Sequence, residues 1–568
     1  MESALVWPQV ALDAVAERDA RIPAFLRLAP SFLANYPLGS DVRSAVEASG
    51  LLTAEELEIT ASTSDATTIL ERIKRKELTA VQIVTAFAKR AAIAHQLLSC
   101  LTDFFLDEAL ERAKQLDDHY EQTGKLVGPL HGLPVSIKDH MDIAGHKSGS
   151  GFSGDTLNPP ASKHGSFAQV LYDSGAVFYC KTNVPQASMH LETYSFWGQV
   201  VNPHNTALTS GGSSGGCSAL VAFGGSPFGT GSDIGGSLRS PSAACGLWTL
   251  KPTTLRVPRG SGSAPLPGAN SIVEAFGPIC RRWVLRRDSS TYYNPDNFNS
   301  LRDIDLWFSV VLGSKPWLNE YDLVPIPWRI SEPSIWSGSD NKIRLGVMWH
   351  DGVVLPQPPI RRALKALVDA LTKIQAFEIV DYLPFKHLEA SELAHELYFV
   401  DGGARVRERA GVTGEPILPL TEWVITHPAV KNHTMAELWD LNLRREALRA
   451  EFLEHYNSQK VDVVLCPVGP SPAPLLGTAK YWGYTNVWNF VDYPAAVFPT
   501  GLYADPVHDL KDSASRTWMS DADVVNTTSY QAEAFKGAPL CLQLVSRRFG
   551  DETVIQALRE IERILPLQ

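Results

Sequence analysis

The sequence has 568 residues, of which 44% are hydrophobic and 20% charged, and its formal net charge is -11. This composition excludes a disordered or fibrous chain, because it supplies enough apolar material for a large core. The acidic balance argues against a broad surface for nucleic acid or an anionic membrane, since both require concentrated positive charge. A small or neutral ligand is favoured. At roughly 150 residues per domain, the length allows three or four domains or one very large one.

Cysteine usage and the termini indicate the cellular compartment. The seven cysteines are scattered without a paired CxxC motif, which argues against a disulfide framework or a zinc site and favours a reducing cytosol. The first residues, MESALVWPQVALDAVAERDARIP, lack the basic start and apolar run of a secretory signal. No stretch nears the ~20 apolar residues that span a bilayer, and the final PLQ is no peroxisomal address. We therefore expect a cytoplasmic protein without a membrane contact.

Amphipathic helices are expected from Ser64 to about Tyr120, where apolar residues recur at helical spacing. One of them begins at Thr79, which forms a capping-box pattern with Gln82. Between Leu130 and Pro258 the short runs LPVSI, AVFYC and ALVAF alternate with Gly/Ser-rich connections. This pattern is typical of strands that end in functional loops.

Further buried strands are predicted at KIRLGVMW from Lys342, VDVVLCP from Val461 and LCLQLV from Leu540. Helical patterns at roughly 432–457 and 551–565 alternate with them. This alternation predicts a layered α/β architecture.

The segment from Arg282 to Asn299, RWVLRRDSSTYYNPDNFN, has neither a helical nor a strand period. It is longer than most loops in compact domains, and the flanking sequences read smoothly into one another once it is removed. Two hypotheses remain open: a genuine surface insertion, or an in-frame unspliced intron. Sequencing the transcript across this junction distinguishes them.

The chemistry is expected in the run TSGGSSGGCSALVAFGGSPFGTGSDIGGSLRSPSAACG, from Thr209 to Gly246. Glycines surround Ser213 and Ser214 and directly precede Ser237, which permits unusual backbone angles and the close approach of a ligand. Consecutive unhindered N–H groups in such loops converge on an anion or an oxyanion.

Three other interpretations of this run are disfavoured. A phosphate loop would end in GxxxxGK[ST], and no lysine follows either cluster. The pattern Gly211-x-Ser213-x-Gly215 matches the nucleophile elbow of α/β-hydrolases, but that turn follows an apolar strand and here polar NPHNTALTS precedes it. A flexible linker does not fit, because the apolar segments SALVAF and ACGLW interleave with the glycines.

Upstream, Lys138 closes the strand-like run LPVSI within GPLHGLPVSIKDHMDIAG. Alone, a lysine at a strand end is usually a solvated surface charge. Together, however, GPLHGLPVSIKD, KTNVPQ from Lys181, NPHN, GGSSGG and GSDIGGSLRSPSAACGLWTLKPT resemble the amidase signature family, most closely its fungal acetamidase-like branch. The similarity covers nearly the whole chain. The spacing of Lys138, Ser213 and Ser237 also agrees with the Ser-Ser-Lys triad of that family.

The resemblance implies that Ser237 is the nucleophile, Ser213 the bridging serine and Lys138 the base. A serine hydroxyl is a poor nucleophile at neutral pH and needs a base within hydrogen-bond reach. A lysine serves only when neutral, and lowering its pKa from about 10.4 to near 7 costs roughly 4 to 5 kcal/mol. Burial among apolar neighbours such as Val135 and Ile137 is expected to supply this desolvation.

The family also implies roles for the surrounding residues. The peptide bond from Gly212 to Ser213 is expected to be cis. The backbone N–H groups of Ile234, Gly235, Gly236 and Ser237 are expected to form the oxyanion hole. Ser214, Asp233 and Arg239 match supporting positions, although Asp233 and Arg239 also fit a solvent-exposed ion pair. Ser188 matches a substrate-lining position, whereas Thr249 and Trp197 depart from the residues usual in the family.

The fold implied by the resemblance is α/β, with a large mixed central β-sheet covered by helices on both faces. Residues 1–60 are expected to form an N-terminal helical extension, and 61–568 the amidase signature domain. The implied function is a serine amidohydrolase that cleaves a small-molecule carboxylic amide through an acyl-enzyme, without metal or organic cofactor and without nucleic acid. A homodimer is a further expectation from the family. The alternatives are a glutamine-dependent transamidase subunit acting on tRNA, or a catalytically inactive scaffold.

Overall fold

The computed structural model describes residues 7–260, 262, 264, 266–281, 301–332, 334–513 and 516–565. The atypical segment from Arg282 to Asn299 lies outside the described residues, so neither hypothesis about it is tested.

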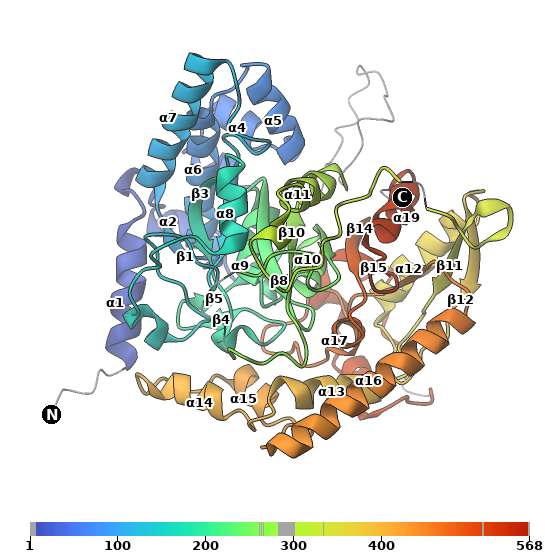
Figure 1. Ribbon diagram of the computed structural model, residues 1–568. Helices are drawn as coiled ribbons and strands as arrows, with labels where there is room; N and C mark the ends of the chain where they lie inside the picture. The colour runs from blue at the N-terminus through green and yellow to red at the C-terminus, as the bar shows by residue number, and fades with distance from the viewer. Residues whose placement is uncertain are drawn as a thin grey trace.

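An eleven-stranded mixed sheet runs through the molecule (Figure 1). Its strands are β1 Leu101–Phe104, β2 Pro134–Lys138, β3 Val177–Thr182, β8 Phe228–Asp233, β9 Trp248–Lys251, β10 Ala275–Cys280, β11 Ile343–Val347, β12 Phe377–Asp381, β13 Val463–Pro467, β14 Ala495–Tyr503 and β15 Pro539–Val545. They are ordered β1-β3-β2-β8-β10-β9-β14-β15-β13-β11-β12. Strand β2 is parallel to β3 and β8, and β11 is parallel to β12 and β13, whereas the remaining neighbours are antiparallel.

Two small hairpins lie outside this sheet: β4 Tyr194–Ser195 with β5 Gly198–Gln199, and β6 Val201–Asn202 with β7 Asn205–Thr209. The helices are α1 Trp7–Ala20, α2 Pro30–Leu33, α3 Ala45–Ser49, α4 Ala54–Ile59, α5 Ala66–Lys74, α6 Ala80–Leu98, α7 Leu106–Thr123, α8 Ser166–Asp173, α9 Gly215–Phe223, α10 Arg239–Cys245, α11 Leu301–Gly313, α12 Pro358–Leu371, α13 His387–Tyr398, α14 Ala404–Gly411, α15 Pro419–Ile425, α16 Met435–Ser458, α17 Gly483–Phe490, α18 Asp521–Thr528 and α19 Asp551–Glu562.

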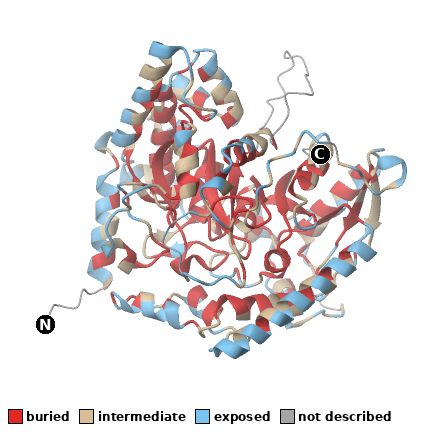
Figure 2. Cartoon of the chain, in the orientation of Figure 1, coloured by how far each residue is buried: buried red, intermediate tan, exposed pale blue. Residues whose placement is uncertain are grey.

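Helices cover both faces of the sheet, as expected for this fold class. Alternate side chains of a strand point to opposite faces. In β13, Val463 and Leu465 therefore join a core that includes residues of α11, α12 and α19, while Val464 and Cys466 join one that includes residues of α13, α16 and α17. The central strands of the sheet are accordingly buried, whereas the edge strand β12 is only partly buried (Figure 2).

Most predicted elements are confirmed. LPVSI and AVFYC lie in β2 and β3, the three later runs lie in β11, β13 and β15, and the two predicted helices are α16 and α19. Thr79 caps α6 with both hydrogen bonds of a capping box to Gln82. The strand expected at ALVAF is wrong, because these residues end helix α9. That helix is buried on nearly all sides, so it shows no amphipathic period, and a short apolar run does not distinguish strand from helix.

Helices α1 to α4 lie within residues 7–59. Ile22, Leu26 and Val42, in the connections between these helices, share a core with Val84 of α6 and Leu220 of α9. The N-terminal part of the chain thus packs against α6 and α9, and α9 directly follows the loop that carries Ser213. None of the described helices combines the length and the apolar character needed to cross a membrane.

Candidate active site

Lys138 is the last residue of β2, and its side chain is buried, with 1% of its surface exposed. Its Nζ donates hydrogen bonds of 2.8 Å to the hydroxyl groups of Ser213 and Ser232. Burial lowers the pKa of Lys138 to about 8, although the negative charges of Glu274 and Asp233 oppose this shift. A lysine in these surroundings reaches its neutral form near physiological pH.

The loop that carries Ser213 passes close to other backbone. The peptide bond between Gly212 and Ser213 is cis. A Cβ atom on Gly212 would lie 2.5 Å from the backbone oxygen of His190, so only glycine fits there. Helix α9 begins two residues later at Gly215. Ser213 is thereby held at the start of a buried helix with its hydroxyl group on Lys138.

Ser237 lies in the loop between β8 and α10 and is 4% exposed. Its backbone oxygen accepts a 3.1 Å hydrogen bond from the amide of Ser214, which joins the two serine loops. Within the described part of the chain, no hydrogen bond connects the hydroxyl groups of Ser213 and Ser237. The structure therefore joins Lys138 to Ser213 by a side-chain hydrogen bond, and Ser214 to Ser237 by a backbone hydrogen bond.

The loop before Ser237 presents free amide groups. Tyr398 Oη and Thr485 Oγ1 each donate a 2.7 Å hydrogen bond to the backbone oxygens of Ile234 and Gly235, respectively. Among the described residues, the amides of Ile234, Gly235 and Ser237 have no acceptor. The amide of Gly236 differs from expectation, since it donates to Asp233 Oδ1 at 2.8 Å. Three unpaired donors thus remain rather than four.

Asp233 and Arg239 brace this loop from inside the protein. Arg239 donates from Nε and from one terminal nitrogen to the two oxygens of Asp233, each at 3.0 Å, and both side chains are fully buried. Asn489 adds a 2.9 Å hydrogen bond to Asp233. Burial alone would raise the pKa of Asp233, but the charge and hydrogen bonds of Arg239 hold it well below its usual range. The alternative of a solvent-exposed ion pair is wrong.

We expect Arg239→Ala to lower the free energy of unfolding by about 3–5 kcal/mol, because it leaves the Asp233 carboxylate buried without its cation. Thermal unfolding of the purified variant measures the loss. The matched control is Arg43→Ala, which removes an ion pair with Asp41 in which both side chains are more than 40% exposed, and it should cost no more than about 1 kcal/mol. Equal shifts of the two melting midpoints would contradict this prediction.

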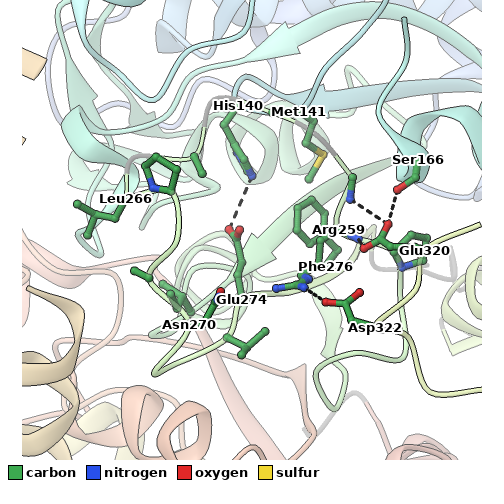
Figure 3. Close-up of a pocket in the computed structure, with 18 of the residues that line it drawn as sticks. His140, Met141, Ser166, Arg259, Leu266, Asn270, Glu274, Phe276, Glu320 and Asp322 are labelled. Carbon is green, nitrogen blue, oxygen red and sulfur yellow. Dashed lines mark hydrogen bonds and ion pairs between the residues drawn. The ribbon is translucent and has the colours of Figure 1, made fainter. Parts of the chain in front are cut away.

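A cavity of about 910 Å³ adjoins the loop at Ile234 and contains Ser188 (Figure 3). The Ser188 hydroxyl is buried and has no hydrogen-bond partner among the described residues. The cavity wall combines apolar and charged residues, which include Met189, Leu266, Ile272, Phe276 and Leu397, and Lys163, Arg259, Glu274, Glu320 and Asp322. Such a mixed lining is typical of a small-molecule site.

The two departures from the expected family residues contact other parts of the fold. Thr249 in β9 donates a 2.6 Å hydrogen bond to the backbone oxygen of Pro278. Trp197 packs against Phe196 and under the guanidinium group of Arg18. Both side chains therefore have structural contacts of their own.

Four residues at the site were not anticipated from the sequence: Ser232, Glu274, Tyr398 and Thr485. Ser232 directly precedes Asp233 within the glycine-rich motif, and its polar side chain in a strand that is buried throughout is a usable signal. The other three reach the site through tertiary contacts only. Tyr398 and Thr485 come from 164 and 250 positions away in the chain, respectively.

Comparison with known proteins assigns the family. The Amidase family model matches residues 82–284 and 298–555, with a gap inside the atypical segment. The Schizosaccharomyces pombe protein named "Putative amidase C550.07" is 42% identical over 98% of this chain and 99% of its own length. The acetamidase of Emericella nidulans is 33% identical over 98% of each chain. Among solved structures, a fatty acid amide hydrolase matches with a TM-score of 0.89 and 31% identity, covering 99% of this chain and 96% of that one.

This fold and these relatives define a hydrolase that acts on amides. The chain belongs to the amidase family, of the amidase signature type.

Proposed function

We propose that this amidase is a serine hydrolase that converts a carboxylic amide to the acid and ammonia or an amine through an acyl-enzyme on Ser237. The observation that carries the proposal is the buried Lys138, whose Nζ lies 2.8 Å from the hydroxyl of Ser213. A backbone hydrogen bond joins the Ser213 loop to the Ser237 loop. A buried amine beside a serine, next to a second serine in a loop with free amides, is the arrangement that activates a hydroxyl nucleophile.

In the proposed mechanism, neutral Lys138 accepts the proton of Ser213 while Ser213 accepts the proton of Ser237. The Oγ of Ser237 then attacks the amide carbon, and the developing oxyanion is stabilised by the unpaired amides of Ile234, Gly235 and Ser237. The proton returns through Ser213 to the leaving nitrogen as the C–N bond breaks. Water then attacks the ester by the same proton route in reverse, which releases the acid and restores the hydroxyl group of Ser237.

The cavity indicates a substrate larger than acetamide. A volume of about 910 Å³ lies within the range of roughly 300–1,000 Å³ that accommodates drug-sized ligands. The apolar wall with Met189, Ile272 and Phe276 suits an alkyl or aryl acyl group. We propose primary amides of medium-chain aliphatic or arylalkyl acids as the substrate class.

Release of ammonia and acid from hexanamide and phenylacetamide by the purified chain alone tests this function. We expect equimolar products without RNA, glutamine or a second chain. We also expect a serine-directed fluorophosphonate to give one covalent adduct, located on Ser237 by peptide mass analysis. Activity that appears only with glutamine and an acylated tRNA would instead identify a transamidase, and the absence of both turnover and adduct would identify an inactive scaffold.

A further inference from the structure

Glu274 is connected to the buried amine of Lys138 through one hydroxyl group. It directly precedes β10, whose Ala275 pairs with Asp233, the residue that follows Ser232 in β8. The register pairs Phe276 with Ser232, which places Glu274, two residues before Phe276, on the same side as Ser232. Burial raises the pKa of the Glu274 carboxyl group, and the charge of Lys138 and the hydroxyl group of Ser232 oppose this rise. Ser232 accepts a 2.8 Å hydrogen bond from Lys138. Lys138 thus lies between the hydroxyl groups of Ser213 and Ser232, and Glu274 lies on the Ser232 side.

The other titratable groups around Lys138 contribute little net charge at neutral pH. The carboxylate of Asp233 is paired with Arg239. Burial raises the pKa of the Cys217 thiol in α9 to about 12. Burial likewise holds the pKa of His140, two residues after Lys138, well below its ordinary value. Both of these groups are therefore uncharged where Lys138 titrates.

Glu274 itself is only weakly compensated. Its carboxylate lies on the cavity wall with 32% of the side chain exposed, 3.7 Å from Nε2 of the uncharged His140 (Figure 3). The nearby cation is Arg259, which already forms an ion pair with Asp322. Glu274 is consequently the negative charge with the largest effect on Lys138, and it favours the ammonium form.

We propose that Glu274 is a positioning residue for Lys138, which orients the amine through Ser232 and sets the pH above which the amine is neutral. This inference rests on the proposed role of Lys138 as the base. Burial lowers the pKa of Lys138, and the negative charge of the Glu274 carboxylate raises it. The pKa of the amine is therefore set by the difference between these two effects. Removing the negative charge of Glu274 should lower the pKa of Lys138 by about one unit, as expected for a partly screened pair of opposite charges. Lys138 should then become neutral at lower pH.

The test is the rate of fluorophosphonate labelling of Ser237 in the full chain as a function of pH, which requires no knowledge of the natural substrate. In the parent protein, labelling should rise with pH and level off above the Lys138 pKa of about 8. In Glu274→Gln this rise should move about one unit toward acid, so that at pH 6.5 the variant reaches a roughly ten-fold larger fraction of its own plateau rate. Damage to the fold cannot produce such a gain at acidic pH.

Two further variants make the test specific. Glu274→Asp retains the charge, so its rise should stay near that of the parent. Glu320→Gln is the same substitution at another residue of the same cavity. Glu320 accepts hydrogen bonds from the backbone amide of Arg259 and the hydroxyl of Ser166, and among the described residues it has none with Ser232. The labelling rate of this variant should therefore rise over the same pH range as that of the parent. An unmoved or alkaline-shifted rise in Glu274→Gln overturns this inference alone, whereas a parent protein that is not labelled at Ser237 overturns the proposed function.

Discussion

Ser237→Ala is expected to lower kcat for amide hydrolysis by about 10⁴-fold or more, because removal of a catalytic nucleophile eliminates the covalent route and leaves only the contribution of binding and oxyanion stabilisation. The same substitution should abolish the covalent adduct. The proposed oxyanion donors are backbone groups, and the substitution keeps all of them. KM should therefore change much less than kcat. Steady-state kinetics and intact-mass analysis after labelling measure the two effects.

The matched control is Ser240→Ala. Ser240 lies three residues further on, at the start of α10, and its amide donates to the backbone oxygen of Gly236. Its hydroxyl group has no proposed part in the reaction, so Ser240→Ala should label as the parent does. Equal labelling of Ser237→Ala and the parent would show that the nucleophile is another residue.

Lys138→Met is expected to cause a loss of similar size, about 10⁴-fold in kcat, because methionine fills comparable space but cannot accept a proton. The sign of the pH dependence follows from the lowered pKa of about 8: only the neutral amine acts as the base, so kcat/KM of the parent should rise roughly ten-fold per pH unit below this value and level off above it. The residual activity of Lys138→Met should lack this rise.

The thermal stability of Lys138→Met separates catalysis from folding. The pKa of a buried lysine is lowered on folding because the folded state disfavours its charge, so below pH 8 the folded chain carries a penalty that the unfolded chain does not. Methionine removes this penalty. The melting midpoint should therefore be unchanged or higher at pH 7, and a lower midpoint together with an unaltered pH profile would contradict the assignment of the base.

The local pattern of the sequence was sufficient for the elements that hold the site. Short apolar runs predict β2, β3, β13 and β15, and the resemblance to the amidase signature family implies the pairing of Lys138 with Ser213, which the fold places in hydrogen-bond contact. These successes share a cause, since strand composition and glycine-serine motifs are local properties. The error at ALVAF has a local cause as well, because a helix buried on all sides lacks the polar face that reveals its period.

Contacts between distant segments were not predictable in this way. The pairing of β8 with β10 brings Glu274 to Ser232, and the packing of α13 and α17 against the Ser237 loop brings Tyr398 and Thr485 to its backbone oxygens. The use of the Gly236 amide by Asp233 is a question of loop geometry. None of these contacts leaves a signature in the spacing of residues along one chain.

The direction of β10 has a consequence for how this enzyme tolerates change in chain length. Ala275 lies beside Asp233 at the reactive end of the strand, while Cys280 lies beside Phe228 at the other end, about 17 Å away at the rise of an extended chain. The connection to α11 leaves from that remote end. A change in chain length directly after Arg281 therefore begins at the end of β10 that lies opposite the loop carrying Ser237.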